Sequence, residues 1–171
     1  MSLGSRLAAG PALAALVLAP LALSACGGAA AATNSGDPVA VAQGYVDAVK
    51  SNPSGGLQFL ESESTEKLTG STSLSRYLAS NKSATAQIVE VPWIAPGSST
   101  AVPSKKQCLV VPPQGGQLCI VTVEVKGGSA TRYFHLNLET RYIPGVFQII
   151  NVDAVSKPDE LLPTGNEAHQ A

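Results

Sequence analysis

Two cysteines placed symmetrically about a proline–glycine turn constrain this chain more than any other feature. Residues 107–111 and 116–120 are rich in β-forming side chains, and 112–115 between them reads Pro-Pro-Gln-Gly. Such a pattern predicts a β-hairpin. With the turn at 112–115, Cys108 faces Cys119, and opposed Cβ atoms in an antiparallel pair lie about 4.5–5.5 Å apart. We therefore expect a disulfide between these two cysteines across the hairpin.

Redox or metal chemistry is the alternative use of this cysteine pair. Ten residues separate Cys108 from Cys119 and no histidine lies nearby, whereas redox sites use C-x-x-C spacing and zinc knuckles use similarly short spacings. A one-residue slip in the hairpin register would place the sulfurs on opposite faces and forbid the bridge. We expect a structural disulfide, with no metal ligands and no cofactor, because the two histidines and the scattered carboxylates have no metal-ligand spacing.

Helices are expected in the first part of the folded chain. Asp37-Pro38 is typical of a helix start, and apolar residues recur at helical spacing until Asn52-Pro53, which ends the helix. A second helix is expected over 56–68, and a short third helix after 71–73.

Strands are expected from residue 85 onward. The run 85–94 is rich in β-formers, although Pro92 predicts an edge or a bulge, and 95–104 is expected to form a loop of Pro, Gly and Ser. After the cysteine hairpin, 131–142 alternates between apolar and polar residues, and a last strand follows at 146–152. The apolar side chains of the alternating strand share one face and are expected beneath the helices: Phe134, Leu136 and Leu138.

Helices followed by an antiparallel meander indicate an α+β fold, with N-terminal helices packed on a curved antiparallel sheet of four to five strands. Three stretches make this pattern similar to the NTF2-like domain of the cystatin-like superfamily. They are Val-Ala-Gln-Gly-Tyr-Val-Asp-Ala-Val at 41–49, the alternating strand 131–142, and Val-Phe-Gln-Ile-Ile-Asn-Val-Asp at 146–153. The resemblance implies a cone whose mouth binds small apolar ligands or carries acid–base groups.

The N-terminus carries export signals. Arg6 precedes an uncharged apolar stretch at 7–23, and small residues then lead to a cysteine in Leu23-Ser24-Ala25-Cys26. This resembles the lipobox of bacterial lipoprotein precursors, and the resemblance implies cleavage before Cys26, diacylation of its sulfur and attachment outside the cytoplasmic membrane. The alternatives are an uncleaved transmembrane helix and a secretory peptide cut elsewhere. The apolar stretch lies at the short end of the roughly 17–25 residues that span a bilayer.

Four segments follow from these signals: 1–25 as signal peptide, 26–36 as lipidated cysteine and flexible tether, 37–157 as the α+β domain, and 158–171 as a loose tail. Loss of Arg6 with the signal peptide leaves ten Lys and Arg against twelve Asp and Glu, a net charge of −2. This weak acidity argues against a nucleic-acid partner, which requires a basic patch. It also provides no attraction to anionic lipid, so we expect the lipid anchor to hold the chain at the membrane.

Candidate acid–base groups are few. Enzymatic NTF2-like domains place Asp, His or Tyr inside the cone, and here the resemblance points to Tyr45, Asp47, Tyr133, His135 and Asp153. General acid–base catalysis requires such a group beside its reactant. Asp47 lies off the apolar stripe of its helix, which indicates a solvated carboxylate. His135 alternates with polar residues, which indicates an exposed or pocket-rim histidine.

Other polar clusters have ordinary structural explanations. Glu61, Glu63 and Glu66 are expected on a solvated helix face, since calcium requires six or more oxygens in a defined loop. Lys105-Lys106 is expected at a strand start. Trp93 is expected in or beside the core, although tryptophans also anchor partners. No phosphate-binding glycine motif is present, which argues against nucleotide cofactors.

These patterns predict a non-enzymatic, lipid-anchored extracytoplasmic domain that binds a small apolar ligand in its cone or a cell-envelope protein. Fold likeness alone adds homodimerisation through the outer sheet face. The expected partner face is the polar side of the alternating strand: Tyr133, His135, Asn137, Glu139 and Arg141. The alternatives are a small enzyme of isomerase or hydratase type, with His135 or Asp153 as base, and a structural surface lipoprotein without a ligand.

Overall fold

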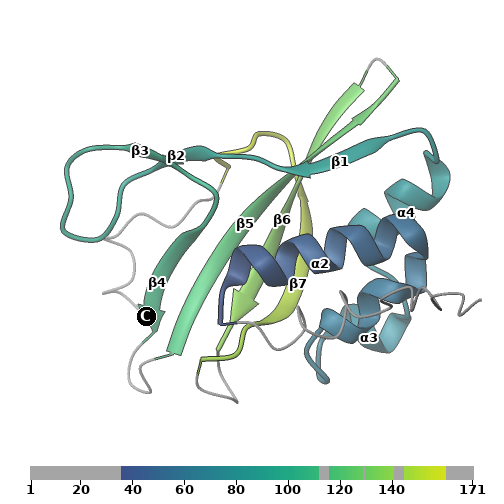
Figure 1. Cartoon of the computed structure of the whole chain (residues 1–171), viewed down its shortest axis with the longest axis horizontal. Helices are drawn as coiled ribbons and strands as arrows, with labels where there is room; N and C mark the ends of the chain where they lie inside the picture. The colour runs from purple at the N-terminus through teal and green to yellow at the C-terminus, as the bar shows by residue number, and fades with distance from the viewer. Residues whose placement is uncertain (1–35, 112–115, 129, 141–144, 161–171) are drawn as a thin grey trace, which may run out of the picture.

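The computed structural model describes residues 36–111, 116–128, 130–140 and 145–160. These residues form a helical layer on one face of an open antiparallel sheet (Figure 1), which confirms the α+β class. The lipobox, Cys26 and Arg141 lie outside the described residues. Within the described ranges, no helix is both long enough and apolar enough to cross a bilayer.

The first helix, α2 (Pro38–Ser51), forms where its capping signals predict it. The Asp37 carboxylate accepts a hydrogen bond from the Val39 N–H at 3.2 Å, and the proline occupies the first turn, where no N–H is required. The helix ends where the Asn52 N–H donates to the Ala48 carbonyl at 2.8 Å. Its apolar stripe faces the sheet.

The expectation of a continuous helix over 56–68 is wrong. This segment begins in a 3₁₀ helix, η1 (Pro53–Phe59), and resumes as the short α3 (Thr65–Thr69). Between them Leu60 leaves the helical path and forms a parallel bridge with Ile149. Burial of Leu60 beside the sheet, where it is 1 % exposed, outweighs the helical pattern that surrounds it.

The third helix, α4 (Ser73–Ser80), confirms the short helix expected after 71–73. A capping box begins it, because the Thr72 hydroxyl accepts from the Ser75 N–H at 3.0 Å and the Ser75 hydroxyl accepts from the Thr72 N–H at 2.9 Å. Leu74 and Leu78 then point into the core.

Five strands form the main sheet, and its centre is the long strand β5 (Gly116–Gly127). Along one side, β5 pairs with β4 (Gln107–Val111) near its start and with β1 (Thr85–Ile88) near its end. On the other side lies β6 (Ala130–Glu139), followed by β7 (Gln148–Val155) at the far edge. All these pairs are antiparallel, as the short links require.

A separate hairpin of β2 (Val91–Trp93) and β3 (Val102–Ser104) lies between β1 and β4. It corrects two expectations: the run 85–94 divides between two sheets, and 95–104 contains a strand. The expected break at Pro92 is present, since the proline lies in the small hairpin directly opposite Pro103. A strand of three residues that contains a proline has too little β-pattern to be recognised in the sequence.

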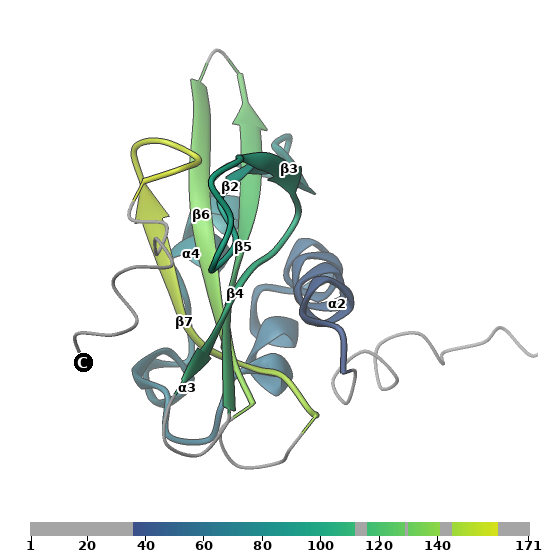
Figure 2. The same ribbon diagram turned by 90° about the vertical axis from the view of Figure 1, so that its left-hand side faces the viewer.

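The main core lies between the helices and one face of the sheet, and Figure 2 shows α2 to one side of the twisted strands. The expected inward residues are confirmed: Phe134, Leu136 and Leu138 are 2 %, 0 % and 0 % exposed. The Tyr77 ring of α4 packs on Phe134 with ring centres 5.8 Å apart. Tyr45 of α2 fills the space beside η1 and is fully buried.

Candidate functional site

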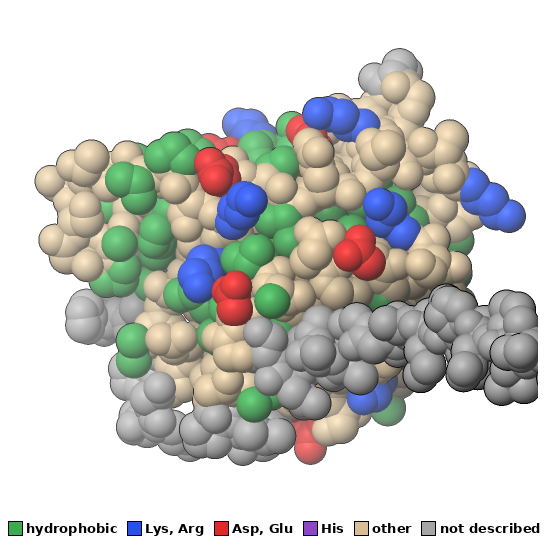
Figure 3. All heavy atoms as spheres, viewed as in Figure 1, with side chains coloured by type: hydrophobic (Ala, Val, Ile, Leu, Met, Phe, Trp, Pro, Cys, Tyr) green, Lys and Arg blue, Asp and Glu red, His purple; other side chains and the backbone are tan. Residues whose placement is uncertain are grey.

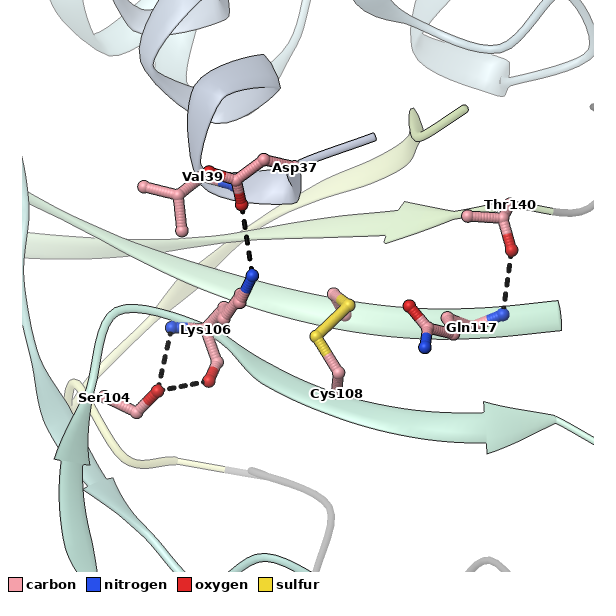
Figure 4. The surroundings of a disulfide bond; sticks show 8 residues. Asp37, Val39, Ser104, Lys106, Cys108, Gln117 and Thr140 are labelled. Carbon is pink, nitrogen blue, oxygen red and sulfur yellow. Dashed lines mark hydrogen bonds and ion pairs between the residues drawn. A yellow bond between two sulfur atoms is a disulfide. The ribbon is translucent and has the colours of Figure 1, made fainter. Parts of the chain in front are cut away.

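The cysteine hairpin has the expected register. Cys108 pairs with Cys119 across β4 and β5, and the two sulfur atoms are bonded at 2.09 Å (Figure 4). Two residues before Cys108, the Lys106 ammonium lies 3.2 Å from the Asp37 carboxylate at the start of α2. The bridge therefore fixes β4 to β5, and the ion pair joins this edge of the sheet to the first helix.

The expected partner face is partly covered by the chain itself. Residues 156–160 cross the sheet face opposite the helices, and the carbonyl of Pro158 lies 3.0 Å from the His135 Nε2 and accepts from the Thr122 hydroxyl at 3.3 Å. His135 is only 3 % exposed, so the expectation of an exposed or pocket-rim histidine is wrong. The turn at 156–160 covers His135, so this residue is buried although it alternates with polar residues.

We call residues 156–160 the C-terminal clasp. The Glu160 carboxylate closes it by accepting hydrogen bonds from the Ser156 N–H at 2.6 Å and from the Ser156 hydroxyl. These bonds, the hydroxyl one foremost, hold the pKa of Glu160 below its usual range. The turn places Pro158 in contact with the sheet.

Other members of the expected partner face hydrogen-bond to neighbouring side chains. The Asn137 amide donates to the Asp153 carboxylate at 2.9 Å, and the Asn151 amide donates to the same oxygen at 2.7 Å. Tyr133, Asn137 and Glu139 are half-buried. The face is therefore a fixed polar surface along β6 and β7.

Glu124 of β5 lies at the centre of a small charged network beside that face. Its Oε1 accepts from the Lys126 ammonium at 2.7 Å and from the Gln87 amide at 2.8 Å. The Lys126 ammonium is the main reason that the pKa of Glu124 lies below its usual range.

The candidate acid–base groups near α2 are engaged in structural contacts. The Tyr45 hydroxyl lies 2.5 Å from the Thr72 hydroxyl inside the core, and burial raises the pKa of Tyr45 far above its usual value. Asp47 is exposed and accepts a hydrogen bond from the Gln43 amide one helical turn away at 3.1 Å. This confirms the solvated placement expected for Asp47.

The segment between η1 and α3 forms a site that the sequence did not indicate. Its Glu61 is 7 % exposed, so the expected solvated face is wrong for this residue. The cause is a hydrogen bond from the Glu61 N–H to the Ile149 carbonyl at 2.8 Å, which fixes the segment against β7. A register shift at this point leaves Ile150 without a partner in β6 and opens the strand edge.

Beside Glu61 lies a hollow of about 620 Å³, which we call the acidic hollow. Its lining includes Glu61, Glu63, Glu66, Ser64, Arg76 and Asn151. Glu66 Oε1 accepts from the Val152 N–H at 3.2 Å, and the Arg76 guanidinium donates to the Ser71 hydroxyl at 3.0 Å. By contrast, Glu61 Oε1 is buried and accepts no hydrogen bond from the part of the chain that the structure describes.

This unpartnered carboxylate oxygen distinguishes Glu61 from the other residues that line the acidic hollow. A carboxylate oxygen removed from water without a donor is costly, so the position favours an incoming N–H or O–H group. The described residues hold no group of three His, Cys, Asp or Glu side chains that could bind a metal ion. The arrangement suits a single cationic or hydrogen-bond-donating group.

A second hollow, of about 430 Å³, lies between the carboxyl ends of α2 and α4. Its lining includes the apolar residues Val49 and Leu78 and the basic residues Lys50 and Lys82. The space between α2 and the sheet is instead filled by fully buried side chains.

No family model matches this chain, and neither a curated protein nor a solved structure is significantly similar to it.

Proposed function

We propose that the mature chain is a lipid-anchored, extracytoplasmic, non-catalytic domain of NTF2-like type that binds a cell-envelope protein through the acidic hollow. The observation that carries this proposal is the buried Glu61 Oε1 that lacks a donor. A lysine, arginine or amino-terminal group of a partner would supply a charge-assisted hydrogen bond there.

The lipobox-like sequence and the cysteine pairing support the same compartment. If Cys26 is acylated, Cys108 and Cys119 are the two cysteines that remain, and they are bridged in the structure. Disulfides persist in oxidising, extracytoplasmic environments. Two acyl chains hold a protein stably at a bilayer, where one chain does not.

The contacts of the candidate acid–base groups favour binding over catalysis. His135 bonds to the Pro158 carbonyl beneath the clasp, Asp153 accepts from two asparagine amides, and Tyr45 bonds to Thr72 in the core. Each group therefore already has a structural partner. A protein ligand is preferred over a small apolar one because side chains occupy the space between α2 and the sheet, whereas the acidic hollow is polar.

The binding proposal is tested by titrating the isotope-labelled protein with a lysine-containing tripeptide and with its norleucine counterpart. We expect amide resonances around Glu61 and Ile150 to shift with the lysine peptide and not with the norleucine peptide. Glu61→Gln keeps the shape and removes the charge, so it should abolish the shifts. The matched control Glu90→Gln, at an exposed carboxylate outside the hollow, should leave them intact.

Equal shifts with both peptides, or shifts that survive Glu61→Gln, would refute the hollow as a cation site. A photocrosslinker at exposed Thr65 then identifies the partner in the intact envelope, with Ser83 as the control position. The anchor is tested separately by mass spectrometry of the chain recovered from its own membranes. An unmodified Cys26 would refute the lipid anchor and leave the binding site standing.

A further inference from the structure

The β2–β3 hairpin exposes apolar side chains and carries no charge. Residues 91–104, here named the apolar arm, contain no Asp, Glu, Lys, Arg or His. Ile94 is 43 % exposed and Val102 is 51 % exposed. Figure 3 shows hydrophobic atoms gathered over the β2–β3 end of the molecule. Such a surface is typical of an interaction site.

Buried residues hold the apolar arm in place. Val91 is 1 % exposed and Trp93 is 8 % exposed, and neither belongs to the core cluster beneath the helices. Leu109 and Ile120 are also buried outside that cluster, on the face of β4 and β5 opposite the disulfide. The base of the arm is therefore anchored, and Ile94 and Val102 are presented to solvent instead of folding back.

The stretch of sequence that contains the arm has charges of the opposite sign to the net charge of the mature chain. Between Val91 and Val123 the sequence contains no acidic residue, and its only charged residues are Lys105 and Lys106. Along the sequence, Glu90 directly precedes the arm and Glu124 is the next acidic residue after it, and the Asp37 carboxylate pairs with Lys106. Lys105 is exposed. An apolar surface beside lysines is complementary to an anionic membrane surface.

The arm also lies where the tether would begin. Lys106 is two residues beyond β3, and its ammonium lies 3.2 Å from Asp37, directly before α2 (Figure 4). Ten residues separate Cys26 from Asp37, and a linker of small residues of about that length spans roughly 18 Å on average. A lipid on Cys26 would therefore hold the base of the arm close to the bilayer surface.

We propose that the apolar arm docks on the anionic bilayer that anchors the chain, with Ile94 and Val102 in the lipid interface and Lys105 beside lipid phosphates. This inference rests on the proposed lipid anchor. In Figure 1 the arm and α3, which borders the acidic hollow, lie at opposite ends of the molecule. Docking by the arm therefore turns the acidic hollow away from the membrane and toward a partner in the envelope.

The test places an environment-sensitive nitrobenzoxadiazole dye on the full lipidated chain through Ser99→Cys, at an exposed position in the loop of the arm. The chain is reconstituted into phosphatidylcholine vesicles with and without phosphatidylglycerol. We expect a blue shift of the dye with phosphatidylglycerol. The same dye on Ser83→Cys, in the turn between α4 and β1 at the other end of the molecule, should not respond.

Variants separate the apolar from the electrostatic contribution. Ile94→Ser with Val102→Ser should abolish the blue shift, whereas Val110→Ser, at a valine 61 % exposed on β4, serves as the matched control and should retain it. For dye-labelled chain added to vesicles from solution, Lys105→Gln should weaken partitioning about fivefold. Emission of the single tryptophan, Trp93, reports whether each variant keeps its fold.

Each other outcome is decisive. If the chain does not float with the vesicles during reconstitution, the lipid anchor is refuted. In that case, excess phosphatidylglycerol vesicles are added to the labelled chain, and its dye still tests docking by the arm. A floating chain whose Ser99 dye matches the Ser83 dye refutes docking and leaves the anchor intact. A blue shift without vesicles that grows with protein concentration would identify a second copy of the chain as the occupant, and would also overturn the proposal.

Discussion

Gly56 shows how strictly one residue can be specified by its neighbours. A Cβ built at this position would overlap Val49 Cγ2 and would lie 2.7 Å from Tyr45 Cε2. Glycine therefore allows η1 to lie directly on α2 at this point. The Gly55-Gly56 pair, which weakens a helix start in the sequence, serves close packing between elements.

Gly56→Ala should destabilise the protein by about 1–3 kcal/mol, because a well-packed core must shift to accept the added methyl group. Urea unfolding measures the loss. Gly116→Ala is the control, since its Cβ would lie 3.7 Å from the nearest atom, the Thr140 hydroxyl. Equal stability of the Gly56 variant and the control would show that the η1–α2 contact is looser than described.

Glu124 and Lys126 predict a pH dependence at the residue scale. Because the folded-state pKa of Glu124 is depressed, its ion pair stabilises the fold above its ordinary pKa of 4.5 and loses that effect as pH falls through the lower folded value. Lys126→Gln should therefore lower the thermal midpoint slightly at pH 7 and have no effect near pH 2. A difference that is equal at both pH values would argue against the pair as its cause.

At the scale of elements, the sequence predicts best where a local pattern and a tertiary contact agree. The sequence predicts both the register of the cysteine hairpin and the inward face of β6. It can do so because side chains alternate between the two faces of a strand with a period of two residues. The break in the helix expected over 56–68 and the existence of strand β3 could not be predicted from the sequence. Contacts far along the chain, such as Leu60 with Ile149 and Trp93 with Val102, determine those segments.

The β4–β5 disulfide is expected to stabilise the domain by about 3 kcal/mol, because it closes a loop with a sequence separation of 11. The double variant Cys108→Ala, Cys119→Ala should lose that amount in urea unfolding. Wild-type protein treated with reductant should lose a similar amount. If reductant changes the wild type but the double variant is as stable as the oxidised protein, chain entropy is not the source of the effect.

At the scale of the whole molecule, the C-terminal clasp changes the character of one sheet face. The sequence predicts an exposed polar face because alternation shows which residues share a side of a strand, but not what covers that side. His135 and Thr122 are covered by a turn that begins more than 20 residues later in the chain. The acidic hollow was unpredictable for the same reason, since burial of Glu61 depends on the register of β7.

The clasp predicts a large difference in histidine reactivity between two truncated chains. The protein has two histidines, and truncation after Glu160 or after Val155 removes His169 in both cases, so His135 alone reacts with diethylpyrocarbonate. The longer chain should react slowly, because its histidine is 3 % exposed beneath Pro158. The shorter chain should react many times faster. Equal rates would mean that the clasp does not shield the sheet in solution.

The two prolines that face each other in the β2–β3 hairpin have a consequence for the colloidal behaviour of the protein. Uncharged apolar strand segments of this kind are common nuclei of amyloid and other cross-β aggregates. Pro92 and Pro103 have no N–H, so the hydrogen bonds between β2 and β3 come from the residue pairs on either side of them. On the outer edge of each strand, the proline lies where an additional strand would need an N–H donor. The arm can therefore keep its apolar side chains exposed without recruiting the arms of neighbouring molecules, even at high protein concentration.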